Sequence, residues 1–261
     1  MTNREGAPVW FELMTEDPDA AQAFYGSILG WTFEPMPGGP EMDYRIATAG
    51  GETVAGVMRT PDHATAMPDM WFFYVGVTDV DASAEKVKLL GGRVDIEPTD
   101  IPDVGRFAFV TDPQGAHFYL MRGDRDREST AFAPMKPGHC CWNELVTSDQ
   151  KAALDFYHEM FGWENGGSMP MGGDMGDYTF INHNDEMIGA VMDAPEKDTK
   201  PFWNFALQVA DIDAAKAAVE TGGGTVRIGP TELPNDGGWL IQATDPQGVK
   251  IMFVGPREAG S

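Results

Sequence analysis

The segment Trp10-Phe11-Glu12-Leu13-Met14-Thr15-Glu16-Asp17 decides the fold, because the chain contains it twice. It returns 132 residues later as Trp142-Asn143-Glu144-Leu145-Val146-Thr147-Ser148-Asp149. Three further pairs of segments repeat in the same or nearly the same register: Phe24-Tyr25 with Phe156-Tyr157, Gly30-Trp31 with Gly162-Trp163, and Thr111-Asp112-Pro113-Gln114-Gly115 with Thr244-Asp245-Pro246-Gln247-Gly248. So many matches in one register indicate an internal duplication.

The duplication predicts two domains joined by a linker. We place the first domain at residues 1–122, the linker at 123–138 and the second domain at 139–261. Each half also repeats within itself. Trp10 and Gly30 are 20 residues apart, and so are Phe72 and Gly92, with similar patterns between them. The chain therefore contains four similar modules.

One module predicts a strand, a helix and three more strands. Val9–Met14 is rich in apolar residues and is typical of a strand. Asp17 is a good N-cap, and Pro18 follows at the first helical position, where proline is tolerated. Gly30 is expected to end the helix. Four such βαβββ modules predict an α+β fold, with two domains of curved mixed sheets covered by outer helices.

Composition and charge exclude several classes of protein. The 261 residues are 42% hydrophobic, which excludes wholesale disorder. Lys and Arg number 18 against 41 Asp and Glu, a formal charge of −23. Such a chain repels phosphate backbones and anionic lipid, so neither nucleic acid nor a membrane is an expected partner. No apolar stretch follows Met1, which favours a cytoplasmic location.

The paired βαβββ modules resemble the vicinal oxygen chelate superfamily, which includes glyoxalase I, extradiol dioxygenases and bleomycin resistance proteins. The resemblance also rests on Phe24-Tyr25 late in the first helix, on Leu29-Gly30-Trp31 after it, and on Asp112-Pro113-Gln114-Gly115 before the last strand. It covers nearly the whole chain and is strongest for tandem two-domain glyoxalase-like proteins. The resemblance implies a cup formed by two modules, in which His and Glu side chains hold a metal that binds two neighbouring substrate oxygens.

The metal positions of the family carry over poorly to this chain. They fall on Trp10, Val57, Phe72 and Tyr119 in the first half, and on Trp142, Ala190, Asn204 and Met252 in the second. The register of Val57 is set only to within about one residue. None of these is a His, Glu, Asp or Cys, the donors that such metals need. We therefore expect no metal and no other cofactor. Six of these positions instead predict a surface that binds a ligand: Trp10, Phe72, Tyr119, Trp142, Asn204 and Met252. The alternative is that the rings simply fill the interior.

Two acids and one histidine are the candidate catalytic residues. Side chains two apart on a strand share a face, so Glu12 accompanies Trp10 and Glu144 accompanies Trp142. A buried carboxylate there is a candidate general base. The alternative is that it is satisfied structurally, for example Glu12 by Arg45 or Arg59. His117 shares a face with Tyr119 and is either a general acid or base or a solvated histidine at a strand end.

These patterns lead to two hypotheses about function. The first is a metal-free protein that binds a small, partly aromatic or apolar molecule, for sequestration, sensing or a conversion that the sequence does not specify. The second is an enzyme of the glyoxalase, hydroxylase or dioxygenase type that uses Glu12 and Glu144, which would make it a lyase or an oxidoreductase. Whether the chain is an enzyme stays open at this point. The expected partner is a small molecule, and the protein is expected to be a monomer or a homodimer.

Overall fold

The computed structural model describes residues 4–36, 43–61, 67–124, 128–172 and 176–257. Two eight-stranded sheets make up the strand structure. The strands of the first sheet, in spatial order, are β2 (Thr32–Pro35), β3 (Tyr44–Ala49), β4 (Glu52–Arg59), β1 (Pro8–Thr15), β5 (Met70–Gly76), β8 (His117–Gly123), β7 (Gly105–Thr111) and β6 (Arg93–Ile101). Those of the second sheet are β10 (Glu164–Pro170), β11 (Asp177–His183), β12 (Glu186–Asp193), β9 (Cys140–Thr147), β13 (Phe202–Gln208), β16 (Lys250–Gly255), β15 (Trp239–Thr244) and β14 (Thr225–Glu232).

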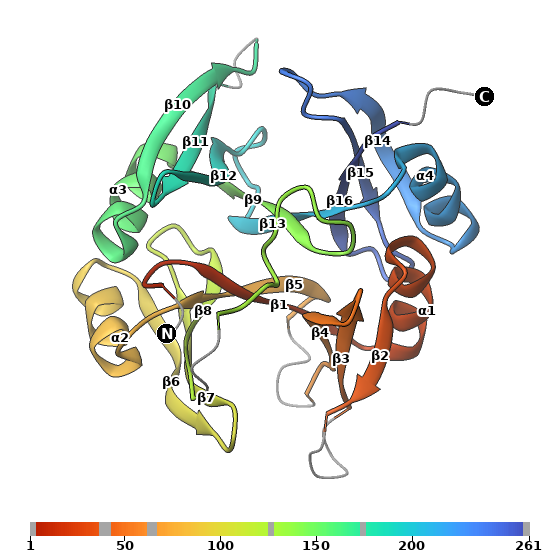
Figure 1. Ribbon diagram of the computed structural model, residues 1–261. Coiled ribbons are helices and arrows are strands. Elements are labelled where there is room, and N and C mark those ends of the chain that lie inside the picture. Colours follow the sequence, from red (N-terminus) through yellow and green to blue (C-terminus); the bar gives the residue numbers. More distant parts are fainter. Residues whose placement is uncertain (1–3, 37–42, 62–66, 125–127, 173–175, 258–261) are drawn as a thin grey trace. The chain divides into compact units, whose positions relative to one another are not determined.

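Both sheets are mixed and curved, as the sequence predicts (Figure 1). The first strand of each module pairs in parallel with the last: β1 with β4, β5 with β8, β9 with β12 and β13 with β16. The other pairings with a defined register are antiparallel. The βαβββ order therefore holds in all four modules, and the predicted α+β fold is confirmed.

The helices begin where short-range rules place them. In the described part of the chain they are α1 (Pro18–Leu29), α2 (Val80–Leu89), α3 (Gln150–Phe161) and α4 (Ile212–Thr221). Each has an Asp N-cap whose carboxylate accepts a hydrogen bond from a backbone N–H three residues later. Gly30 and Gly162 end α1 and α3 at φ of 67° and 70°, the left-handed conformation that glycine adopts without steric cost.

The chain divides into two compact units that do not follow the two sequence halves. Unit 1 comprises residues 1–9, 72–129 and 142–204, and unit 2 comprises residues 10–71, 130–141 and 205–261. Each unit thus takes one module from each half. In unit 1, α2 lies beside α3, and in unit 2, α1 lies beside α4 (Figure 1). The domain boundaries at 122 and 139 stay a prediction about the repeat in the sequence.

Each unit contains a buried chain of hydrogen bonds that joins its two modules. In unit 2, Trp71 Nε1 donates to Tyr25 Oη at 2.9 Å, and Tyr25 Oη donates to Asp245 Oδ2 at 3.1 Å. In unit 1, Trp203 Nε1 donates to the hydroxyl of Tyr157 at 3.0 Å, and that hydroxyl donates to Asp112 Oδ2 in the other module. Burial raises the pKa of both tyrosines well above its usual value, so both stay protonated and act as donors.

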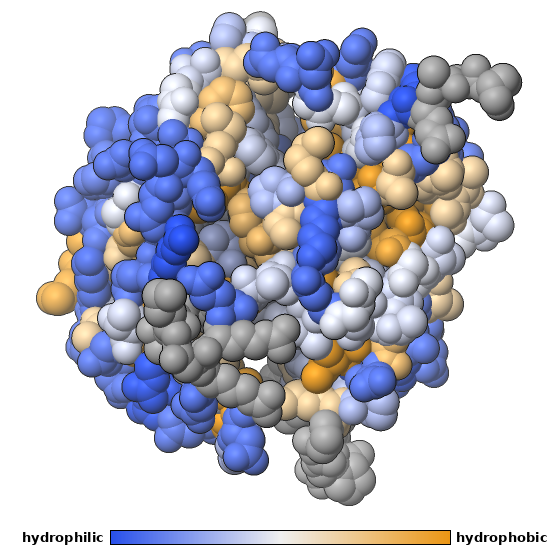
Figure 2. All heavy atoms as spheres, in the orientation of Figure 1, coloured by the Kyte–Doolittle hydropathy of each residue, from blue (hydrophilic) through white to orange (hydrophobic). Residues whose placement is uncertain are grey.

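The outer surface is largely hydrophilic over the face shown in Figure 2, where the hydrophobic residues form separate small areas. This agrees with the formal charge of −23. No helix among the described residues is long and apolar enough to cross a membrane.

Candidate functional site

A buried carboxylate in unit 1 is tied to a tyrosine and a tryptophan from neighbouring strands. Trp142 and Glu144 stand on the same face of β9, because side chains two apart share a face. Trp142 Nε1 donates to Tyr178 Oη at 2.8 Å, and Tyr178 Oη donates to Glu144 Oε2 at 2.8 Å. The hydroxyl of Tyr178 on β11 therefore links the two predicted site residues.

Burial sets the protonation behaviour of this group. Glu144 is only 9% exposed, and burial raises the pKa of its carboxyl above the ordinary 4.5. Hydrogen bonds from Tyr178 and Asn204 oppose that shift. Burial and the Glu144 charge raise the pKa of Tyr178 well above its usual value. The tyrosine therefore keeps its proton, and Glu144 is the member of the pair that gains or loses one.

Asn204 adds an acceptor to the same group. Its side-chain amide hydrogen bonds to Glu144, and a carboxylate can only accept, so Asn204 donates through its nitrogen. The amide oxygen, Oδ1, is then buried with no hydrogen-bond partner in the described part of the chain. Leaving such an atom without a partner costs about 1–3 kcal/mol, so this oxygen favours a ligand that donates a hydrogen bond.

Unit 2 contains the matching tryptophan, tyrosine and carboxylate. Trp10 Nε1 donates to Tyr44 Oη at 2.9 Å, and Glu12 lies on the Trp10 face of β1, 3% exposed. Gly56 on β4 pairs with Glu12 on β1. A Cβ atom added to Gly56 would lie 2.1 Å from Tyr44 Oη. Glycine at this position therefore lets the tyrosine lie across the strand.

The two tyrosines are functional candidates that the sequence prediction missed. Tyr44 and Tyr178 are 134 residues apart, close to the repeat shift of 132. A full comparison of the two halves would have shown them as a repeated pair. Their contact with the first strand could not be inferred from spacing alone, since it depends on how β3 and β11 are placed in their sheets.

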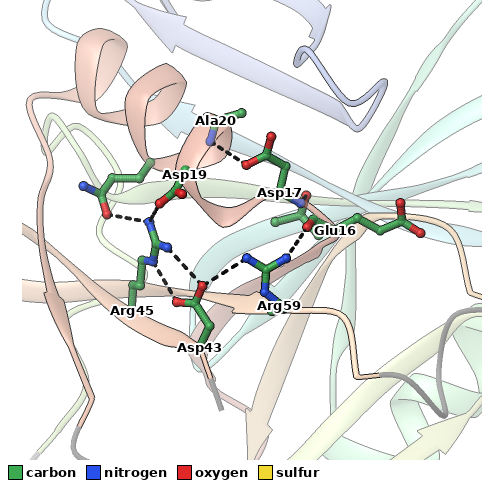
Figure 3. A network of polar contacts seen from close by, with 9 residues as sticks. Glu16, Asp17, Asp19, Ala20, Asp43, Arg45 and Arg59 are labelled. Atoms are coloured by element: carbon green, nitrogen blue, oxygen red, sulfur yellow. Dashed lines mark hydrogen bonds and ion pairs between the residues drawn. The ribbon is translucent and has the colours of Figure 1, made fainter. Parts of the chain in front are cut away.

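A network of charged residues ties Asp43 and Arg45, the two neighbours of Tyr44 in sequence, to α1 and β4 (Figure 3). Arg45 contacts Asp43 at 2.9 Å and Asp19 at 2.7 Å, and Arg59 contacts Asp43 at 3.4 Å. Both arginines thus pair with aspartates, and the alternative that one of them also pairs with Glu12 stays a prediction. The Arg45 guanidinium holds the pKa of the Asp43 carboxyl below its usual value. The network therefore fixes the backbone on both sides of Tyr44.

Phe72 and Tyr119 belong to a cluster of aromatic rings in unit 1. Their ring centroids lie 5.8 Å apart, and Tyr119 also stacks on Tyr74 at 4.2 Å and packs against Phe109 at 4.6 Å. Phe72 is 1% exposed and Tyr119 5%. The rings of this cluster therefore mainly cover one another.

His117 lies at the edge of this cluster. Its imidazole stacks on Phe109 with centroids 5.4 Å apart, and its Nδ1 lies 2.8 Å from Thr111 Oγ1. The ring is half-buried, and burial lowers its pKa below the ordinary 6.5. His117 is therefore neutral at pH 7.

The parallel registers correct one of the predicted positions. Val57 pairs with Leu13 and so lies on the face opposite Glu12; Gly56 is the residue that shares the Glu12 face. Ala190 pairs with Glu144, in the predicted position. Met252, in unit 2, pairs with Ala206 and is 2% exposed.

The donor set does not fit the metal that the resemblance implies. The inward position on β4 is glycine, which offers no side-chain donor, and the other carried-over positions hold aromatic, aliphatic or amide side chains. No group of three or more His, Cys, Asp or Glu that could hold a metal ion occurs among the described residues.

The chain belongs to the Glyoxalase/Bleomycin resistance protein/Dioxygenase superfamily, whose family model matches residues 7–120 and 136–253. It is 35% identical over 256 residues to a protein named "Putative glyoxylase CFP32" from Mycobacterium tuberculosis, covering 97% of this chain and 96% of that one. It is 32% identical over 279 residues to "Anthracycline biosynthesis protein DnrV" from Streptomyces peucetius, covering 97% and 94%.

Solved structures show the same fold at low identity. A Mn(II)-bound glyoxalase from Novosphingobium aromaticivorans aligns with a TM-score of 0.62 at 19% identity, covering 99% of this chain and 84% of that one. The 2,2',3-trihydroxybiphenyl 1,2-dioxygenase from Sphingomonas wittichii aligns with a TM-score of 0.67 at 15% identity, covering 98% and 91%.

Proposed function

We propose that this protein binds a small, partly apolar molecule without a metal, through the Trp142–Tyr178–Glu144–Asn204 group of unit 1. The observation that carries the proposal is the buried carboxylate of Glu144, which shares one face of β9 with the Trp142 indole and is bonded to Asn204. The amide oxygen of Asn204 favours a hydroxyl or amine donor on the ligand, and the indole favours an apolar or aromatic part. Trp10, Tyr44 and Glu12 are proposed as a second group of this kind in unit 2.

Two further observations support this proposal. The carried-over metal positions lack metal donors, so recognition rests on hydrogen bonds and apolar contact. Two relatives are named for anthracycline biosynthesis, and anthracyclines are small molecules with both an aromatic part and hydroxyl groups. The predicted ligand-binding roles of Phe72, Tyr119 and Met252 remain part of the proposal.

Metal content and ligand-induced stabilisation test the proposal. Protein purified without chelator is analysed for metals and then melted with Ni²⁺, Zn²⁺, Mn²⁺ or Fe²⁺, because a ligand of the folded state raises Tm by mass action. We expect no stoichiometric metal and no metal-induced shift. Aromatic alcohols and amines are then screened in the same assay. An Asn204→Asp variant is expected to lose stabilisation by hydroxyl ligands, because a second carboxylate would sit beside Glu144. One or two equivalents of bound metal would overturn the proposal.

An enzyme is the second candidate function, and the raised pKa of Glu144 favours it. A raised pKa makes the ionised carboxylate a stronger base, which favours the acceptance of a proton from a substrate. Relatives named glyoxylase are consistent with this reading. We expect Glu144→Gln to abolish turnover of an oxoaldehyde–thiol adduct or an oxidisable aromatic compound, if either is a substrate, while the fold survives. Glu12→Gln tests the same role in unit 2. Turnover that is unchanged in both variants excludes these bases.

A further inference from the structure

A row of four polar side chains crosses strands β6, β7 and β8 in unit 1. Arg93, Thr111 and His117 occupy paired register positions on the three strands, and Asp95 lies two residues after Arg93. Arg93 Nε donates to Asp95 Oδ1 at 2.6 Å, and Arg93 Nη2 donates to Thr111 Oγ1 at 3.2 Å. Thr111 Oγ1 also bonds to Asp95 Oδ2.

The three hydrogen bonds of the Thr111 hydroxyl determine the tautomer of His117. A hydroxyl has one hydrogen, and Thr111 gives it to Asp95, because an ionised carboxylate can only accept. Arg93 and His117 then occupy the two lone pairs of Thr111 Oγ1 as donors. His117 therefore donates from Nδ1, and in the neutral ring this leaves Nε2 with a lone pair. Nε2 makes no hydrogen bond or ion pair with any described residue.

The fold does not require this row. The positions equivalent to Arg93, Asp95, Thr111 and His117 in the second half are Thr225, Arg227, Thr244 and Lys250. Strands β14, β15 and β16 pair with the same topology without an imidazole or a carboxylate there. The Arg93–Asp95–Thr111–His117 row is therefore an addition to one half of a duplicated chain, which points to a role other than holding the strands together.

We propose that His117 Nε2 is the acceptor of a second ligand site, which binds the neutral O–H, N–H or S–H group of a small molecule. The stacked contact with Phe109, at an interplanar angle of 22°, holds the imidazole in place, and the His117 ring itself is half-buried. Asp95 and Thr111 act through His117 and are positioning residues. This inference does not depend on the Glu144 group.

Imidazole ¹⁵N NMR of the full chain tests the tautomer directly. The His117 signals are assigned by their loss in His117→Gln. At pH 7 we expect Nδ1 to have the chemical shift of a protonated nitrogen and Nε2 that of an unprotonated one. Thr111→Val is expected to release the ring to the opposite tautomer. Thr244→Val, the matched change in the second half, should leave the His117 signals unaltered. Protonated Nε2 in the unmodified protein overturns the inference without any variant.

Ligand recognition is tested with benzyl alcohol and its methyl ether, which differ in the hydroxyl hydrogen. We expect benzyl alcohol to move the His117 Nε2 signal in a saturable way, and the ether to leave it in place. The effect of benzyl alcohol should persist in Glu144→Gln, which separates this site from the proposed Glu144 site. Equal shifts with both compounds, or none with either, would show that Nε2 accepts no ligand donor.

Discussion

Tyr157 Oη donates a hydrogen bond to Asp112 Oδ2 across 3.1 Å, although the two residues belong to different halves of the sequence. Asp112 Oδ1 accepts three backbone N–H bonds within its own turn, from Gln114, Gly115 and Ala116. One carboxylate therefore closes a tight turn and also holds a helix from the other half. This explains why the Phe-Tyr and Asp-Pro-Gln-Gly segments are repeated together.

Removing the Tyr157 hydroxyl should destabilise the protein. In Tyr157→Phe, both Asp112 Oδ2 and Trp203 Nε1 lose a buried partner. We expect a loss of about 1–3 kcal/mol in the free energy of unfolding, measured by urea denaturation. In an Asp112→Asn background the same change should cost less, because the carboxylate is already absent. Equal costs in both backgrounds would show that the two residues are not coupled.

Replacing Glu144 with glutamine should stabilise the protein at neutral pH. The folded-state pKa of Glu144 is raised, so its ionised form weakens the native state above the ordinary value of 4.5. The excess Tm of Glu144→Gln should therefore grow as pH rises through the folded pKa, and vanish below the ordinary value. Tyr178 and Asn204 donate hydrogen bonds to the Glu144 carboxylate, and a glutamine is a weaker acceptor for both. This loss reduces the gain in stability at high pH.

Asp43→Asn is the matched control with the opposite sign. Arg45 lowers the Asp43 pKa from 3.8, so Asp43 adds stability above that value that is lost as pH falls. The variant should have a lower Tm at neutral pH and approach the unmodified protein in acid. If Glu144→Gln and Asp43→Asn changed Tm in the same direction at neutral pH, the environments assigned to Glu144 and Asp43 would be contradicted.

Adding one methyl group at Gly56 should displace Tyr44. The new Cβ would lie 2.1 Å from Tyr44 Oη, which breaks the bond to Trp10 Nε1. We expect Gly56→Ala to lower stability by about 1–3 kcal/mol and to shift the tryptophan fluorescence. Ala190→Gly, the reciprocal change in the second half, should cost only about 0.5–1 kcal/mol. An unchanged spectrum in Gly56→Ala would place Tyr44 elsewhere.

Arg45→Lys should weaken the network around Tyr44. Arg45 reaches Asp43, Asp19 and Gln22 at once, which a single ammonium group cannot do. We expect a cost of about 0.5–1.5 kcal/mol, smaller at high salt. Arg59→Lys is the control, because this side chain is 51% exposed and the change should stay within about 0.5 kcal/mol. Equal costs would mean that the Arg45 contacts add no stability.

Local signals predicted the helices and most strands. Asp17, Pro18 and Gly30 act on backbone groups within a few residues, and α1 indeed spans Pro18–Leu29 with Gly30 as its C-cap. Helix α2 ends at Leu89, because Leu90 acts as its C-cap. Helix ends of this kind depend on one turn of backbone and vary by a residue or two.

Long-range partners lay beyond the sequence pattern. The sequence places Asp112 just before the last strand of its module, but the hydrogen bond of Asp112 to Tyr157 depends on two modules meeting in one unit. Val57 was placed one residue out of register, because the register of β1 with β4 depends on the length of the chain between them. In the second half that intervening chain is two residues longer, as Glu144 pairs with Ala190 whereas Glu12 pairs with Gly56.

Each compact unit is assembled from one module of each sequence half. An ancestor of half this length would have had to recruit a second copy of itself to build either unit, and every inherited change would then have appeared in both. Fusion of the two copies into one gene removes that constraint. His117 pairs with Thr111 in one half of the repeat and Lys250 pairs with Thr244 in the other, a difference that two identical copies of one chain could not contain.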